Sequence, residues 1–282
     1  MRIDQLLVER GLAASRSQAQ RLIAAGVTWR LHPGDWQRVG KNRDDVPETA
    51  ELVLQDDAES RYVSRGGLKL EGALRHTGLR VEGLRCLDVG QSTGGFTDCL
   101  LHHGAAEVVG VDVGHAQVHE RIRNNARVTC IEGLNARELQ LDDERIPDGT
   151  EGFDVMVGDV SFISLTLVLP GVVHFLKPEG QLLMLVKPQF ELQPGQVGKH
   201  GIVRDPALYD FVQERVCAAL VGLGLKVNAW MDSVIDGGDG NKEFFVHAAW
   251  AQPETLLAER AQMRQDREAA AAQALQDALD DY

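Results

Sequence analysis

A strand, a glycine-rich turn and the start of a helix follow one another in residues 84–97, which read LRCLDVGQSTGGFT. The apolar run at 84–89 predicts a buried strand, and the glycines after it predict a tight turn into a helix over 96–103. Glycine at such a turn lets a small molecule approach the backbone, because no side chain is in the way. The spacing is not the G-x-G-x-x-G of dinucleotide sites, and no G-K-[ST] of triphosphate sites follows. This stretch predicts an α/β fold with a ligand site at the turn, and a purely structural turn is the alternative.

Apolar, β-rich runs alternate with helical patterns through the residues that follow. The expected strands are 84–89, 107–112, 127–131, 153–158, 181–186, 226–233 and 243–250, and the expected helices include 96–103, 164–176 and 206–222. This alternation predicts a doubly wound α/β sheet, mostly parallel. The turn-rich stretch 234–242 between the last two strands predicts that the sheet ends in an antiparallel hairpin.

The residues before this sheet predict a smaller α+β module. Helical spacing covers residues 3–11, and a second helix begins after Ser15 or Ser17 and ends at Gly26. Short strands are expected at 27–29 and 51–54. The polar run 56–60 is typical of a linker, and the Ala- and Gln-rich end is expected to be a helical tail. The predicted domains are 1–60, 61–250 and 251–282.

Charge is distributed unevenly along the chain. The 282 residues hold 29 Lys and Arg against 42 Asp and Glu, a net charge of −13, and a uniformly acidic surface repels nucleic acid and anionic lipid. Residues 1–43 nevertheless carry eight basic residues against three acids, a balance of +5, whereas the tail carries −4. A basic N-terminal module therefore predicts a polyanionic partner, and a merely solvated helix face is the alternative.

Several classes of protein are disfavoured. No run of apolar residues reaches the ~18 that a membrane-spanning helix needs, and the start of the chain lacks the apolar core of a secretion signal. The four cysteines have no C-x-x-C spacing, which is typical of reduced cytosolic thiols and not of disulfides or a zinc site. A cytoplasmic protein without a metal or a membrane partner is expected, and a monomer is favoured.

The N-terminal residues resemble the S4 RNA-binding domain. The matching stretches are RIDQLL at 2–7 and SRSQAQRLIAAGV at 15–27, and the chain departs from the family where TWRLHPG at 28–34 replaces a short hairpin. The resemblance implies that RNA is bound by Arg2, Arg16 and Arg21.

The glycine turn and an acid after the next strand resemble the S-adenosylmethionine site of class I methyltransferases. Asp112 ends the second strand, where a carboxylate can accept hydrogen bonds from ribose hydroxyls. The resemblance implies that the cofactor is contacted by Asp88, Gly90, Ser92, Thr93, Gly94, Gly95, Phe96, Asp112, Asn135 and Asp159.

Four charged residues have the order and context of the Lys-Asp-Lys-Glu tetrad of FtsJ-type ribose 2′-O-methyltransferases: Lys69, Asp159, Lys187 and Glu243. A ribose hydroxyl becomes a good nucleophile only when a base takes its proton. A second ammonium nearby and partial desolvation both favour a neutral lysine amine, whereas the two carboxylates of the tetrad favour the protonated form. The resemblance implies that Lys187 is the base and that Asp159 contacts it. A base N-methyltransferase would more often carry an Asn/Asp-Pro-Pro-aromatic string where this chain has Asp159-Val160-Ser161-Phe162.

Almost the whole chain is similar to the TlyA family of ribosomal RNA methyltransferases, which is also called a hemolysin family. The matching strings are YVSRGGLKL, LDVGQSTGGFTDCLL, VDVGHAQ, DVSFISL, LVKPQFE, VGKHGIVRD and DGGDGNKEFFVHA. The family commonly has alanine where this chain has Gln91. The resemblance implies methyl transfer from S-adenosylmethionine to a cytidine 2′-hydroxyl of 16S or 23S rRNA. A non-catalytic ribosome-assembly factor and a secreted hemolysin are the alternatives.

A basic, glycine-bracketed segment follows the strand that carries Lys187. Lys199 and Arg204 lie in this segment, and a loop that closes over RNA phosphates is expected, with a flexible connector as the alternative. Arg65, just before Lys69, is a further candidate RNA contact. His115 and His119 are expected to be exposed helix residues and not ligands.

Overall fold

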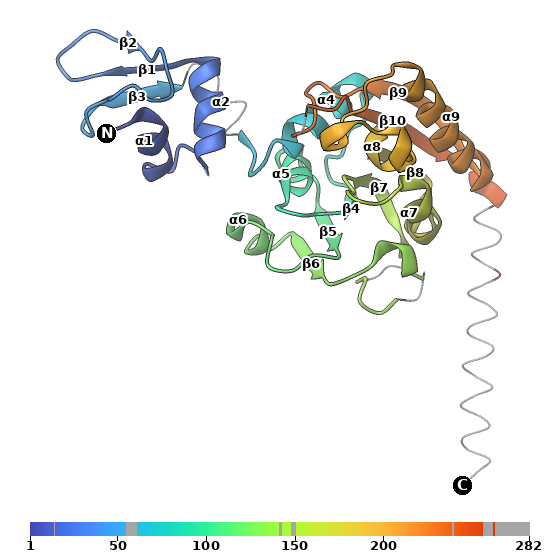
Figure 1. Cartoon of the computed structure of the whole chain (residues 1–282). Coiled ribbons are helices and arrows are strands. Elements are labelled where there is room, and N and C mark those ends of the chain that lie inside the picture. Colours follow the sequence, from blue (N-terminus) through green and yellow to red (C-terminus); the bar gives the residue numbers. More distant parts are fainter. Residues whose placement is uncertain are drawn as a thin grey trace. The chain divides into compact units, whose positions relative to one another are not determined.

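The computed structural model describes residues 1–13, 15–54, 61–140, 143–147, 151–238, 240–255 and 262. The chain divides into two compact units, of which the first is Met1–Leu134 with Ser233–Asp236 and the second is Asn135–Asp232 with the residues from Gly237 onward. Figure 1 shows the helices and strands of each in sequence colours. The expected linker at 56–60, and the expected tail apart from 251–255 and 262, lie outside the described residues.

The N-terminal module consists of two helices and a small antiparallel sheet (Figure 1). Its elements are α1 (Ile3–Glu9), α2 (Arg16–Gly26), β1 (Val27–Arg30), β2 (Gln37–Arg38) and β3 (Glu51–Leu54), and the strand order is β2-β1-β3. The Ser15 side chain accepts a hydrogen bond from the Gln18 amide and so caps α2. The apolar faces of both helices share one core, which includes Ile3, Leu7 and Leu22.

The larger sheet has seven strands among the described residues, in the order β6-β5-β4-β7-β8-β10-β9. They are β4 (Arg85–Val89), β5 (Glu107–Asp112), β6 (Val128–Glu132), β7 (Phe153–Gly158), β8 (Leu176–Val186), β9 (Leu225–Asp232) and β10 (Phe244–Trp250). The pairs β4–β5, β5–β6 and β7–β8 are parallel. Strand β10 pairs antiparallel with both β8 and β9. The predicted α/β class and the antiparallel hairpin are therefore confirmed.

Helices connect these strands. The first unit holds α4 (Gly66–Thr77), α5 (Gly95–His102) and α6 (Glu120–Arg123), and the second holds α7 (Leu165–Val172), α8 (Pro188–Glu191) and α9 (Ala207–Gly222). Strands β4 and β7 are almost wholly buried, as continuous apolar runs in a parallel sheet must be.

Three local predictions need correction. The helix expected over 164–176 ends earlier, because α7 gives way to a 3-10 turn at Val173–Phe175 and β8 begins at Leu176. Strand β2 and helix α6 were not predicted, since both are short and α6 spans only four residues. His115 and His119 are exposed, as expected, but His115 lies in a bend and His119 is the N-cap of α6.

Candidate active site

The turn after β4 has the conformation that its glycines predict. Gly94 takes φ +93° and caps α5, and a Cβ built there would lie 3.1 Å from Ile122. At Gly95 a Cβ would lie 2.1 Å from Ser64 Oγ, so only glycine lets α5 begin this close to the segment before α4. The side chains of Ser92 and Thr93 are exposed at the tip of the turn. The backbone of the turn is therefore open to a ligand, while the start of α5 is buried.

Three buried polar side chains at this turn are linked to one another by hydrogen bonds. The Thr97 hydroxyl donates to Asp88 Oδ2 at 2.7 Å, and Gln91 Nε2 donates to Thr97 Oγ1 at 2.9 Å. All three side chains are at most 4% exposed. A Cβ at Gly110 would lie 2.0 Å from Gln91 Cδ, so the Gln91 side chain occupies the space left by that glycine on β5. This explains how the chain accommodates a glutamine at position 91.

Asp112 lies at the carboxyl end of β5, beside the turn. Its Oδ2 accepts a hydrogen bond from the Ser92 amide at 2.7 Å, and its Oδ1 accepts one from the Gly114 amide at 2.6 Å. The residue is half-buried, and each carboxylate oxygen has a second lone pair. A glycine turn with a fixed carboxylate beside it, and no triphosphate-type loop, fits a nucleoside that presents ribose hydroxyls.

Two other predicted cofactor residues have different surroundings. Phe96 is 3% exposed in the first turn of α5. Asn135 belongs to the second compact unit, where its side chain caps the 3-10 turn Ala136–Glu138 and its amide donates to Glu138 Oε1 at 2.6 Å. Their contact with a cofactor remains a prediction.

Asp159 and Lys187 form an ion pair. Each follows directly on its strand, β7 or β8, and these strands are parallel neighbours, so both residues lie at the same edge of the sheet. Lys187 Nζ lies 2.5 Å from Asp159 Oδ1 and donates to Ser161 Oγ at 2.6 Å. The side chains are 12% and 24% exposed for the lysine and the aspartate. Solvent therefore still reaches this amine, as proton exchange requires.

The other two tetrad residues are both buried. Glu243 is 4% exposed just before β10, and a Cβ on Gly237 would lie 2.5 Å from its Oε1. Lys69 is 7% exposed in α4 and belongs to the first compact unit, whereas Asp159, Lys187 and Glu243 belong to the second. The structure brings Asp159 and Lys187 together, and the full tetrad remains a prediction.

The sequence analysis did not include Glu191, which lies four residues after Lys187 at the end of α8. It is 2% exposed, and its carboxylate accepts hydrogen bonds from the Ser164 hydroxyl at 2.5 Å and the Leu165 amide at 2.6 Å. Burial raises the pKa of Glu191, although both hydrogen bonds act in the opposite direction. The signal in the sequence is weak: a single acid among apolar residues in LVKPQFE.

The predicted RNA-binding residues differ in their exposure and in the hydrogen bonds that they make within the protein. Arg2 forms a two-point contact with the buried Asp4, with Nη2 2.7 Å from Oδ2, and this contact lowers the pKa of Asp4. Arg65 donates to the Asp236 carbonyl at 3.1 Å. Arg16, in the first turn of α2, is exposed, and Arg21 is half-buried one turn later. Lys199 begins the short 3-10 turn Lys199–Gly201 and Arg204 lies three residues after it, and both are exposed.

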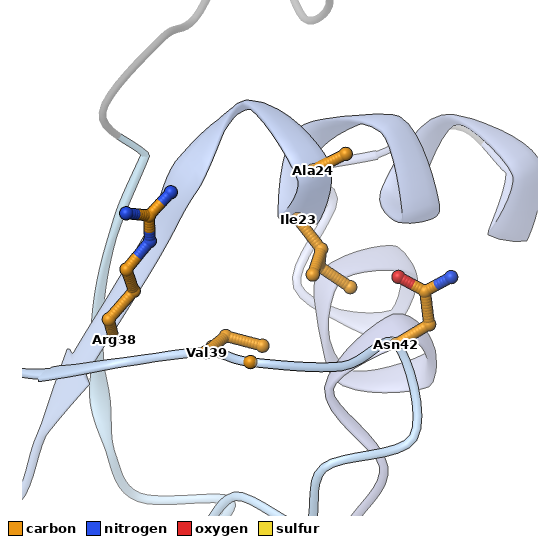
Figure 2. A pocket seen from close by; sticks show the side chains of 6 residues that line it. Ile23, Ala24, Arg38, Val39 and Asn42 are labelled. Carbon is orange, nitrogen blue, oxygen red and sulfur yellow. The ribbon is translucent and has the colours of Figure 1, made fainter.

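A cavity of about 400 Å³ lies in the N-terminal module, between the end of α2 and the segment after β2 (Figure 2). Ile23, Ala24 and Val39 are its apolar side chains, and the side chains of Arg38 and Asn42 flank them. The cavity thus combines apolar side chains with a cation and an amide, a combination that suits part of a nucleotide.

Within the described part of the chain, no group of His, Cys, Asp or Glu side chains could hold a metal ion. The same residues include no helix with the length and apolar character needed to cross a membrane.

Comparisons with known proteins agree with this geometry. Residues 62–250 match the FtsJ-like methyltransferase family, and residues 1–26 match the S4 domain. The chain is 42% identical over 255 residues to the 16S/23S rRNA (cytidine-2′-O)-methyltransferase TlyA of Mycobacterium tuberculosis, with 90% of each chain covered. It is 37% identical over 249 residues to Hemolysin A of Brachyspira hyodysenteriae, covering 88% of this chain and 99% of that one.

A solved structure of a hemolysin candidate from Streptococcus thermophilus superposes with a TM-score of 0.66 at 38% identity, covering 96% of this chain and 98% of that one. Family, relatives and fold therefore all indicate methyltransferase architecture with an N-terminal RNA-binding module. The chain belongs to the FtsJ-like methyltransferase family and, within it, to the TlyA proteins, which place an S4 domain before the methyltransferase domain.

Proposed function

We propose that the protein methylates a ribose 2′-hydroxyl of ribosomal RNA, and that the nucleotide is a cytidine of 16S or 23S rRNA. The single observation that carries the chemistry is the Asp159–Lys187 pair at the edge of the sheet, 2.5 Å between Oδ1 and Nζ. The RNA substrate is supported by the S4 match and by the relative from M. tuberculosis, whose name states this activity. Ribosomes are the substrate, so the expected location is the cytoplasm.

The methyl donor would be held by the turn after β4 and by Asp112. The exposed tip of the turn at Ser92 and Thr93 leaves room for a nucleoside, and Asp112 retains acceptor capacity beside the amides that fix it. S-adenosylmethionine supplies an electrophilic methyl group when it is bound. The buried chain of Gln91, Thr97 and Asp88 keeps the turn in place for this purpose.

Lys187 acts as the base in this proposal. Its neutral amine accepts the proton of the ribose 2′-hydroxyl as that oxygen attacks, and it then returns the proton to solvent. Asp159 and the Ser161 hydroxyl hold Nζ in one position. Lys69 and Glu243 complete the tetrad in this proposal, and Glu243 would orient one of the lysines.

The two alternatives make different predictions. An assembly factor needs RNA binding but no base, so Lys187 could be replaced without consequence. A hemolysin, the name given to the B. hyodysenteriae relative, would lyse erythrocytes independently of Lys187. The proposal rests on the Asp159–Lys187 pair, which neither alternative uses.

The test uses S-adenosylmethionine with a labelled methyl group and ribosomal subunits from a strain that lacks the modification. The wild type is expected to place a ribose methyl on rRNA, identified by nuclease digestion and mass spectrometry. Lys187→Ala should lower the rate by at least about 100-fold, because a general base contributes that much or more. The matched control is Lys177→Ala, which removes a cation from the same strand, where it pairs with Asp154 at 2.8 Å. If neither subunit gained a ribose methyl, or if Lys187→Ala were as active as the control, the proposal would be wrong.

A further inference from the structure

The two segments that carry the Asp159–Lys187 pair are joined to each other several times. The post-β7 segment is Asp159–Ser164, and the post-β8 segment is Lys187–Glu191. The ion pair joins the first residues of both segments, and Lys187 also donates to Ser161. The rings of Phe162 and Phe190 lie 5.3 Å apart between their centroids. Glu191 closes the far end through Ser164 and the start of α7.

Among the residues that join the two segments, Glu191 is the most deeply buried. Its side chain is 2% exposed, whereas Phe162 is 91% exposed and Ser161 lies at the surface. Both carboxylate oxygens have partners at the start of α7, one the hydroxyl of its N-cap Ser164 and the other the Leu165 amide. Charge-assisted hydrogen bonds of this kind are roughly twice as strong as neutral ones, and a helix N-terminus favours a negative charge.

The backbone of Glu191 is held as well. Arg215 of α9 donates from Nη1 to the Glu191 carbonyl at 3.0 Å. The end of α8 is thus fixed on one side to α9 through its backbone and on the other side to α7 through its side chain. Without Glu191, the post-β7 segment and the start of α7 would lose two buried hydrogen bonds to the post-β8 segment.

We propose that Glu191 is a positioning residue for the reaction: by binding Ser164 and Leu165 it holds the post-β7 segment against the post-β8 segment, so that Asp159 meets Lys187. This inference rests on the proposed function. Glu191 touches neither reactant, and its effect passes through Asp159 and Ser161 to the lysine amine. Misplacement of a reacting group by about 1 Å can lower a rate by roughly 100-fold, so a small shift of Asp159 suffices.

The test measures kcat, the KM for S-adenosylmethionine and thermal stability with ribosomal subunits as substrate. Glu191→Ala is expected to lower kcat by about tenfold or more, because Asp159 loses its fixed position. The KM for S-adenosylmethionine should change by a smaller factor, because the turn after β4 and Asp112 are untouched and only the expected Asp159 contact is displaced. Glu191→Gln keeps an acceptor for the Leu165 amide and should restore most of kcat. Ser164→Ala removes one of the two hydrogen bonds to the Glu191 carboxylate, so its kcat should lie between those of Glu191→Ala and Glu191→Gln.

Asp154→Asn is the matched control. It removes a carboxylate from β7 that pairs with Lys177 on β8, the same two strands, and should leave kcat unchanged. The kcat of each variant is compared per folded molecule. If Glu191→Ala and Ser164→Ala both have a kcat as high as that of Asp154→Asn, the positioning role is overturned. If Glu191→Ala does not fold, Ser164→Ala decides the question by the same comparison.

The outcomes also separate this inference from the proposed function. Loss of methylation in Lys187→Ala together with full kcat in Ser164→Ala and both Glu191 variants would overturn the positioning role alone. Full activity in Lys187→Ala would overturn the proposed function and with it the positioning role.

Discussion

Asp112 is a single residue on which the methyl-donor site depends. Its two oxygens already accept hydrogen bonds from the amides of Ser92 and Gly114, so the carboxylate shapes the turn and remains able to accept from a ligand. The residue type and its place at the end of β5 were predictable from the sequence. The two amide contacts were not, because they depend on the path of the turn after β4.

Replacing Asp112 by alanine is expected to weaken the binding of S-adenosylmethionine by at least about tenfold, which corresponds to about 1.4 kcal/mol at 25 °C. The reason is that alanine has no carboxylate to accept hydrogen bonds from the ligand or from the amides of Ser92 and Gly114, which fix the turn. Isothermal titration calorimetry on the full chain measures the change. Glu107→Gln, which alters the opposite end of β5 where Glu107 pairs with Arg85, should bind as the wild type does. Equal affinities for the Asp112 and Glu107 variants would contradict the assignment.

The elements around the reactive lysine were partly predictable. Strands 107–112 and 153–158 have the predicted bounds, because continuous apolar runs define buried parallel strands. Helices α7 and α8 were less accessible to prediction: α7 contains Pro170, and α8 has four residues. Their mutual attachment through Glu191 joins residues 27 positions apart, and no local pattern encodes such a contact.

This attachment has a consequence for the pH dependence of stability. Burial raises the pKa of Glu191 in the folded state, against the opposing effects of Ser164, Leu165 and Arg215. A carboxyl whose folded pKa lies above its unfolded value of about 4.3 is bound to its proton more tightly when folded. Its contribution to stability is therefore fully present below that unfolded value and is lost as the pH rises through the folded value.

The stability of the wild type relative to Glu191→Gln is thus expected to decrease as the pH rises from 4 towards 8, since glutamine does not titrate. Urea unfolding at several pH values measures the free energy of unfolding of both proteins. Two parallel curves, or a wild type that gains stability relative to the variant with rising pH, would show that the pKa of Glu191 is not raised.

At the scale of the whole molecule, the net charge of −13 conceals a division of roles. Residues 1–43 have a balance of +5, and the S4 match covers 1–26 of them. An acidic protein can therefore bind RNA when its cations are concentrated in one module, because phosphate contacts are local and screened beyond about 10 Å.

The salt dependence of RNA binding tests this division. Arg16→Ala and Lys199→Ala should each reduce the slope of log K against log salt by about one unit, because each removes one phosphate contact. Lys177→Ala should leave the slope unchanged, since Lys177 pairs with Asp154. Binding to a ribosomal RNA fragment at 50 to 300 mM salt provides the slopes. If the slope for Arg16→Ala equals that for Lys177→Ala, Arg16 makes no phosphate contact and its place on the RNA-binding surface is wrong.

The sequence by itself determined the α/β class, the order of the strands along the chain, the glycine turn and the identity of the charged residues after the strands. These features are encoded by neighbours within a few positions, through apolar periodicity and backbone preference. The contact between Asp159 and Lys187, which the family resemblance implied, takes its geometry from the tertiary structure. Only the tertiary structure decided that Gln91 fills the space over Gly110 and that the Glu191 carboxylate is buried against the start of α7. The physical reason is the sheet: the parallel register of β7 and β8, with Gly158 opposite Met184, brings together residues that are far apart in the chain.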